Sequence, residues 1–311
     1  MYLTKKTIIN ACTSFALLLQ VCVVLMLAVV ITEAQQKNKK DGPTPAATAP
    51  RLTRTTTRHE VRRFGYAGAL TIIGAPAGSI TIEAWPKSEV DITADIELHA
   101  DTEEDLALLS TVNSFVLDED ANHLRILTTG THDKDTMKRA AKHAAKSFPK
   151  KLLGLPWKID YRIRVPAMTD IEINAGRGAI TLGGVEGTIR ITALESDLKL
   201  NLTGGMVTAT VGAGAINVTL GTRSWRGTGA DIQLARGDLT LELPAGYSGE
   251  INASILGTGK IESEYTALEP REREVFTSHS MKARAGAGGP TLSFTVRDGT
   301  LYIKKAVVKE P

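Results

Sequence analysis

The sequence predicts an all-β protein: a β-solenoid of the single-stranded β-helix kind, with rungs of 18 to 23 residues. Two observations predict it. A segment of alternating apolar residues returns five times, and a small residue, glycine in four of the five copies, marks its middle. The markers are 18, 18, 23 and 22 residues apart: Gly178, Ser196, Gly214, Gly237 and Gly259. Such alternation is typical of half-buried strands, and glycine between two strands permits a turn with positive φ.

Stacked rungs place equivalent side chains about 4.8 Å apart along the solenoid axis. We therefore expect one buried ladder made of Ile180, Leu198, Ile216 and Leu239. A β-sandwich also contains many short strands and glycine turns, and it remains the alternative fold. A sandwich, however, gives no reason for the same two-strand unit to return twice in succession after 18 residues.

The segments before the repeats fit the same domain. Residues 65–98 alternate in the same way as the repeats, and residues 123–128 predict a further strand. A short helix is expected over 102–112, because Asp101 or Thr102 can cap it and acidic residues occupy its first turn.

After the repeats, two further strands are expected over 291–296 and 300–303. Arg297-Asp298-Gly299 stands between them, which predicts a β-hairpin. The hairpin is expected to close the end of the solenoid, where a strand edge would otherwise be exposed.

The N-terminal residues 1–34 predict a signal peptide or, if it is not cleaved, an N-terminal membrane anchor. Two lysines precede an apolar run over 15–31, and Ala34 offers the small residue that signal peptidase requires. We therefore expect an exported protein of the cell envelope: periplasmic, on the outer surface or tethered to the inner membrane. Both cysteines, Cys12 and Cys22, lie in this leader, so the mature domain contains no thiol for disulfides, zinc–thiolate sites or cysteine catalysis.

Residues 35–63 predict a disordered basic linker. Eight Lys and Arg stand there against Asp41 and Glu60, and no apolar periodicity offers enough burial to offset the entropy cost of ordering. The linker is either a solvated spacer or a contact with an anionic surface. The domain itself is expected over 64–305, followed by a tail over 306–311.

A long basic insertion interrupts the domain over 131–158. Its helical spacing of apolar residues ends at Pro149, and no acidic residue stands between Met137 and Lys158. One interpretation is contact with an anionic surface, either lipid headgroups or acidic glycan. The other is a helix that packs on the solenoid with a solvated basic face. The candidate contact residues are Lys138, Arg139, Lys142, Lys146, Lys150, Lys151 and Trp157.

No enzyme, cofactor or metal signature is present in the sequence. The GxG sequences return at rung spacing without a following helix, which indicates turns, and the six histidines show no metal-ligand spacing. A net charge of +3 and 5% aromatic residues argue against nucleic-acid binding. A polysaccharide-degrading solenoid is the remaining enzyme candidate, with Asp197 and Asp238 in one outer register about 10 Å apart. We expect no enzymatic activity.

Four segments resemble a known family, the adhesin-type domains of unknown function in bacterial envelope proteins. They are GALTIIGAPAGSITIEAW, YRIRVPAMTDIEINAGRGAITLGGVEG, GDLTLELPAGYSGEINASILGTGKIES and GPTLSFTVRDGTLYIKK, and the resemblance extends over about 64–305. It implies an exported or membrane-tethered, β-solenoid-like binding module with no catalytic residues to carry over. The basic insertion departs from the family's pattern. The expected partner is an envelope component: an anionic lipid, a glycan or a protein. An envelope scaffold or stress-sensing component that acts through protein contacts is the alternative.

Overall fold

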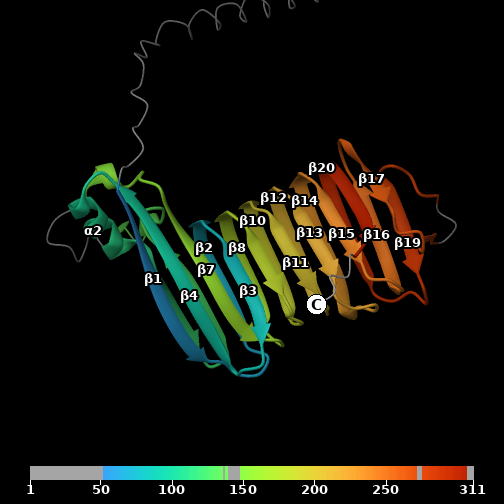
Figure 1. The fold of residues 1–311 in the computed structure, drawn as a ribbon, viewed down its shortest axis with the longest axis horizontal. Coiled ribbons are helices and arrows are strands. Elements are labelled where there is room, and N and C mark those ends of the chain that lie inside the picture. The colour runs from blue at the N-terminus through green and yellow to red at the C-terminus, as the bar shows by residue number, and fades with distance from the viewer. Residues whose placement is uncertain (1–51, 136, 139–147, 272–274, 307–311) are drawn as a thin grey trace, which may run out of the picture. The chain divides into compact units, whose positions relative to one another are not determined.

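The structure, a computed structural model, describes residues 52–135, 137–138, 148–271 and 275–306. These residues belong to one compact unit, and the predicted leader lies outside them. The described part is all-β, as predicted, and its strands belong to one mixed sheet (Figure 1).

Antiparallel strands form the N-terminal part of the fold. β4 pairs on one side with β1 and on the other with β7, and β5 pairs with β6. The predicted helix is confirmed as α2, which Thr102 caps by accepting a hydrogen bond from the Asp105 N–H at 3.1 Å. The elements of this part are β1 (Leu52–Arg63), β4 (Glu89–Ala100), α2 (Glu103–Val112), β5 (Ser114–Asp120), β6 (His123–Thr129) and β7 (Trp157–Pro166).

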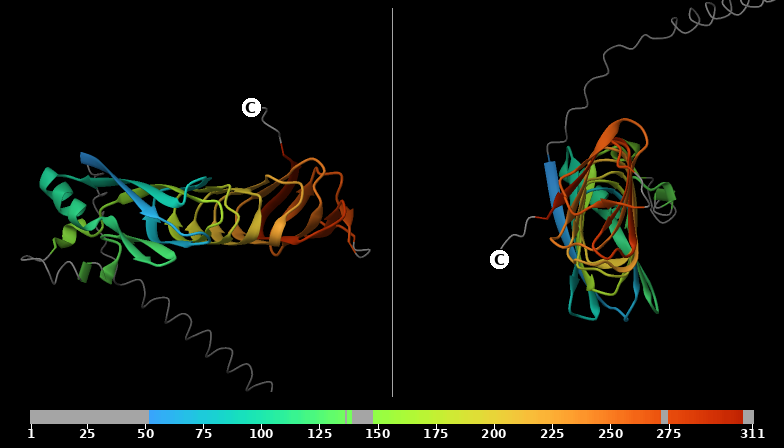
Figure 2. Two further views of the ribbon diagram at one scale, coloured as in Figure 1. Left: turned by 90° about the horizontal axis from the view of Figure 1, so that it is seen from below. Right: turned by 90° about the vertical axis from the view of Figure 1, so that its right-hand side faces the viewer.

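Parallel strands form the rest of the fold in two ladders that face one another across the core (Figure 2). The first ladder continues from β6 in the order β2 (Ala69–Ala77), β8 (Asp170–Arg177), β10 (Thr188–Glu195), β12 (Gly204–Ala213), β14 (Arg226–Arg236), β20 (Thr291–Lys305) and β16 (Gly249–Ile255). The second continues from β7 in the order β3 (Ile80–Trp85), β9 (Ile180–Gly183), β11 (Leu198–Leu202), β13 (Ile216–Leu220), β15 (Leu239–Leu243), β20 and β17 (Gly259–Ser263). Beyond β16 lie β19 (Ser280–Ala285) and β18 (Glu269–Pro270), both antiparallel to their neighbours.

The predicted apolar ladder is confirmed. Its four residues are paired from strand to strand in register, and each is at most 1% exposed: Ile180, Leu198, Ile216 and Leu239. The marker residues stand at the bends that join the two ladders. At Gly237, for example, φ is +126°, and an added Cβ would overlap the carbonyl oxygen of Gly214 on the neighbouring bend. Only glycine meets both conditions at this position.

The prediction of a disordered linker over 35–63 is wrong for its last part, because residues 52–63 form β1. Every residue of β1 pairs with a residue of β4. Its side chains contribute as well: the Cζ atom of Arg58 lies 4.3 Å from the ring centroid of Phe115, and the Arg58 guanidinium donates a hydrogen bond to the Phe115 carbonyl at 2.6 Å. Backbone pairing and these contacts order a strand that has almost no apolar side chains of its own.

The prediction of a closing hairpin over 291–303 is also wrong, because β20 runs as one strand through both ladders. Gly299, with φ of +149°, bends the strand from the first ladder into the second instead of reversing it. β20 therefore separates the bend at Gly237 from the bend at Gly259, which the sequence predicts to be neighbours.

Candidate functional site

The structure describes four of the seven residues that are predicted to contact an anionic surface. Lys138 is exposed, and its Nζ lies 3.1 Å from Asp135 Oδ1. Lys150 is also exposed, at the start of the 3-10 helix η1 (Lys150–Leu152). The three that lie outside the described residues are Arg139, Lys142 and Lys146.

Lys151 forms an ion pair within the protein. Its Nζ lies 2.8 Å from Oδ2 of Asp105, whose side chain is only 11% exposed. The hydrogen bond from Lys151 is the main influence that holds the pKa of Asp105 below its usual value. Because Asp105 belongs to α2, this pair ties the end of the basic insertion to the helix. Of the two adjacent lysines, Lys150 and Lys151, one is therefore already paired with a carboxylate of the protein.

The prediction that Trp157 is an interfacial aromatic is wrong. Trp157 begins β7, pairs in register with Leu98 and is only 9% exposed. The alternation of β7 explains its burial, because Trp157, Ile159 and Tyr161 share the face that points into the core. The ring centroid of His132 lies 5.3 Å from that of Trp157. The aromatic therefore anchors the start of the insertion instead of contacting a surface.

His132 makes the stability of this anchor sensitive to pH. His132 is exposed to solvent on one side, and the partial desolvation of its ring lowers its pKa below the usual value, although the charge of Asp133 and the backbone of Gly74 act in the opposite direction. The unfolded chain therefore binds a proton more tightly than the folded chain. We expect full stability above the unfolded pKa of about 6.5 and a progressive loss as the pH falls below it. Urea denaturation at pH 7.5 and pH 5.5 measures the loss.

A His132→Gln variant should lose less stability between these two pH values than the wild type. His279→Gln is the matched control, because His279 is exposed like His132 but makes its hydrogen bonds within its own turn, whereas the ring of His132 contacts Trp157. An equal loss in the wild type and in His132→Gln would show that other groups cause the pH dependence.

The aspartates that follow the marker positions hold neighbouring bends together. Asp197 Oδ1 accepts a hydrogen bond from the Ala215 N–H at 2.8 Å, and Asp238 Oδ1 accepts one from the Thr300 N–H at 2.8 Å. In the strand order, Ala215 lies between the two aspartates, as predicted. Each of the two carboxylates thus has a backbone partner on the next bend.

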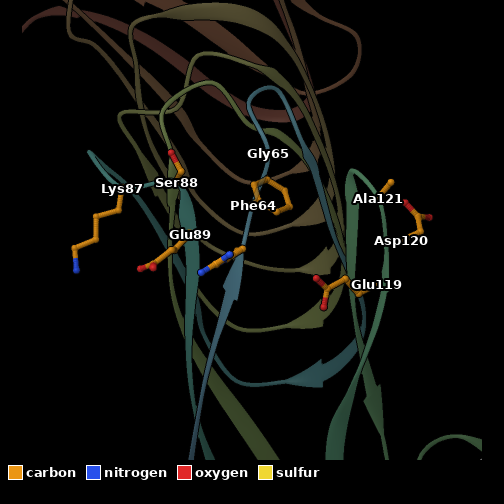
Figure 3. Close-up of a pocket in the computed structure, with 9 residues that line it drawn as sticks. Phe64, Gly65, Lys87, Ser88, Glu89, Glu119, Asp120 and Ala121 are labelled. Atoms are coloured by element: carbon orange, nitrogen blue, oxygen red, sulfur yellow. The ribbon is translucent and has the colours of Figure 1, made fainter.

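An open cleft of about 840 Å³ lies near the N-terminal end of the fold (Figure 3). Acidic side chains at the end of β5 contribute to it, and they are paired. Arg62 Nε lies 3.6 Å from Glu119 Oε2, and Arg125 donates to Asp120 Oδ2 at 2.9 Å. The lining residues are Arg63, Phe64, Gly65, Lys87, Ser88, Glu89, Glu119, Asp120 and Ala121. With two cations and three carboxylates, the cleft favours neither an anionic nor a cationic ligand.

Uncharged polar side chains line one outward row of the first ladder. The register joins one residue from each of six adjacent strands: Asn174, Thr192, Thr210, Gln233, Thr295 and Ser254. Three of them are exposed and three are half-buried. Hydroxyl and amide groups donate and accept hydrogen bonds, and neighbouring strands lie about 4.8 Å apart. The row is regular and carries no charge of its own, and two of its amides, Asn174 and Gln233, donate hydrogen bonds to Glu172 and Asp231 of the adjoining row. The sequence did not reveal the row because β20 supplies Thr295 out of chain order.

The described residues contain neither a cluster of metal ligands nor a membrane-spanning helix. No three His, Cys, Asp or Glu side chains of this part lie together in a way that could hold a metal ion. No helix of the same residues is long and apolar enough to cross a membrane.

No family model matches the chain, and no curated protein matches it. Among solved structures, it is similar to a "putative cell adhesion protein" from Clostridium sporogenes ATCC 15579. The identity is 12% and the TM-score 0.44, with 81% of this chain and 100% of the other covered. It is also similar to a "putative adhesin" from Bacteroides fragilis NCTC 9343, with 15% identity, a TM-score of 0.32 and coverage of 81% and 97%. Both TM-scores are below 0.5, so neither similarity assigns a role or a ligand to this chain.

Proposed function

We propose that this protein is a non-enzymatic binding module of the bacterial cell envelope, exported or membrane-tethered, with an adhesin-like role. The observation that carries the proposal is the outward polar row of the first ladder, in which six strands present hydrogen-bonding groups in register. A long, regular and shallow surface suits the binding of an extended partner better than the chemistry of a small substrate, for which enzymes use concave pockets.

The architecture that we propose for this module is a β-solenoid. Support comes from the in-register parallel pairing of both ladders and from the bends at glycine that join them. Adjacent strands of a β-sandwich are mostly antiparallel, which leaves a stack of parallel pairs without an explanation.

The basic insertion is the part of the module for which we propose contact with an anionic surface. Lys138 and Lys150 are both exposed, which leaves them accessible to such a partner. Each Lys or Arg near an anionic membrane contributes about 1 kcal/mol to binding, so four of them contribute about 4 kcal/mol, close to a thousandfold in affinity.

The test is the binding of purified residues 35–311 to anionic liposomes and to acidic glycans across a salt series. We expect binding at 0.1 M salt that is lost at 1 M, because the Debye length falls from about 10 Å to about 3 Å. Glutamine at four positions should weaken the binding at low salt by about a thousandfold. The four positions are Lys138, Arg139, Lys142 and Lys146.

A charge-matched control replaces four exposed cations elsewhere with glutamine: Arg190, Lys199, Arg236 and Lys305. This control should keep the affinity of the wild type. If the wild type binds neither the liposomes nor the glycans, the proposed contact with an anionic surface is wrong. The alternative is then favoured, an envelope scaffold or stress-sensing component that acts through protein contacts.

A further inference from the structure

The strand β20 lies out of chain order in both ladders. It pairs with β14 and β15 on one side and with β16 and β17 on the other, all in parallel (Figure 1). These neighbours precede β20 by at least 28 residues, as the bounds of β17 and β20 show. The chain therefore leaves a slot between β14/β15 and β16/β17 that only its last described strand fills.

The slot and the strand fit one another along the whole length of β20. Five apolar side chains of the strand enter the core, and each is at most 1% exposed: Leu292, Phe294, Val296, Leu301 and Ile303. Backbone bonds form on both edges. The Gly237 N–H donates to the Asp298 carbonyl at 2.9 Å, and the Leu256 N–H donates to the Val296 carbonyl at 3.0 Å. An empty slot would expose a strongly apolar groove with two unpaired strand edges.

A glycine-rich segment leads into β20. Residues 286–290 include Gly286, Gly288 and Gly289, with φ of +56°, +80° and +151°. The segment passes the start of β16, where Ser248 holds it. The Ser248 Oγ donates to the Gly288 carbonyl at 3.0 Å and accepts from the Ala287 N–H at 3.1 Å. Glycine allows many backbone conformations, so this segment has the properties of a hinge, which the Ser248 side chain holds closed together with the hydrogen bond from the Glu250 N–H to the Pro290 carbonyl at 3.3 Å.

We propose that β20 is an exchangeable strand and that the slot between β14/β15 and β16/β17 binds β20 of a second copy of this chain. The two copies are chemically identical, so reciprocal exchange retains every contact of the strand and changes only the hinge over 286–290. The product is a dimer that carries two copies of every outward surface. Two linked surfaces bind an extended partner more tightly than one, whichever ligand the module takes.

The experiment uses the whole chain with Cys12→Ser and Cys22→Ser, which leaves no native thiol. One preparation carries D231C and another carries S293C, at positions that are register partners on β14 and β20. The two are mixed, incubated and then oxidised, and the disulfide between different chains is quantified by mass spectrometry. Exchange brings the two thiols onto neighbouring strands about 4.8 Å apart, within the Cα separation that a disulfide accepts.

The control mixture combines S293C with R190C. Arg190 is exposed and shares the outward register row of Asp231 and Ser293, but it lies two strands from β14, so exchange does not bring it next to β20. At micromolar protein we expect the interchain disulfide to form about a thousandfold faster from D231C than from R190C, since docking raises the effective concentration of the two thiols from micromolar to millimolar. Adding S248A should speed exchange about tenfold, because it removes two hydrogen bonds of the hinge.

A single chain that carries both D231C and S293C provides the last arm. Oxidised before mixing, it should form an intrachain disulfide, which confirms the closed pairing, and it should no longer exchange with other chains. Equal interchain yields from D231C and R190C, including no disulfide from either, would overturn the proposal.

Discussion

Replacing Gly237 with alanine is expected to lower the free energy of unfolding by about 2 to 6 kcal/mol. Two effects add up. The backbone at Gly237 has φ of +126°, which L side chains rarely adopt, and the added Cβ would overlap the carbonyl oxygen of Gly214. Backbone strain of this kind costs about 1 to 3 kcal/mol, and forced overpacking costs a similar amount. Because the overlapping atom belongs to the backbone of the next bend, no side-chain rotation can relieve it.

Two other glycines separate these effects. At Gly154 an added Cβ meets nothing within 4 Å, so Gly154→Ala should change stability by no more than about 0.5 kcal/mol. At Gly246 φ is +72°, but the nearest atom lies 3.9 Å away, so Gly246→Ala should show strain alone, about 1 kcal/mol. Urea denaturation with an unchanged m-value provides the comparison. If Gly237→Ala cost no more than Gly246→Ala, the close approach of neighbouring bends would not matter for stability.

Phe294→Ala is the second change with a large expected effect, a loss of about 3 to 5 kcal/mol. Phe294 is 1% exposed, and it stands in register between Ile232 of β14 and Ala253 of β16. Truncation leaves a cavity where β20 joins one group of strands, which ends with β14 and β15, to the other group, β16 and β17. Among the described strands, β16 and β17 pair with the rest of the ladders only through β20. We therefore expect β16, β17 and β19 to lose hydrogen-exchange protection before β8 and β10 do.

Thr295→Ala is the matched control, because the next residue of the same strand points to the outer face and is half-buried. It should change stability by no more than about 0.5 kcal/mol and leave the exchange pattern as it is. A uniform loss of protection along both ladders in Phe294→Ala would contradict the role of β20 as the link between the two groups.

The charge pattern of the sequence predicted the basic insertion but not the contacts that its residues make. The run of lysines and arginines predicted a basic insertion, and Lys138 and Lys150 are exposed. The pattern did not reveal that Lys151 pairs with Asp105, because that carboxylate is 46 residues away in the chain. Nor could it place Trp157. An aromatic after a basic run looks the same whether it anchors a strand in the core or meets a surface.

The sequence by itself determined which side of each strand faces the core, because side chains alternate strictly along a strand and Ile180, Leu198, Ile216 and Leu239 repeat that alternation. It also determined where the chain must bend, since positive φ and close approach both require glycine. The repeat also predicted that the strands of Ile180, Leu198, Ile216 and Leu239 lie side by side, but which strands pair outside this repeat was decided only in the tertiary structure. Backbone N–H and carbonyl groups are alike on every strand edge, so the local sequence of a strand does not specify which other strand it pairs with. For that reason β1 finds β4 without an apolar face, and β20 enters between strands that the chain order would have made neighbours.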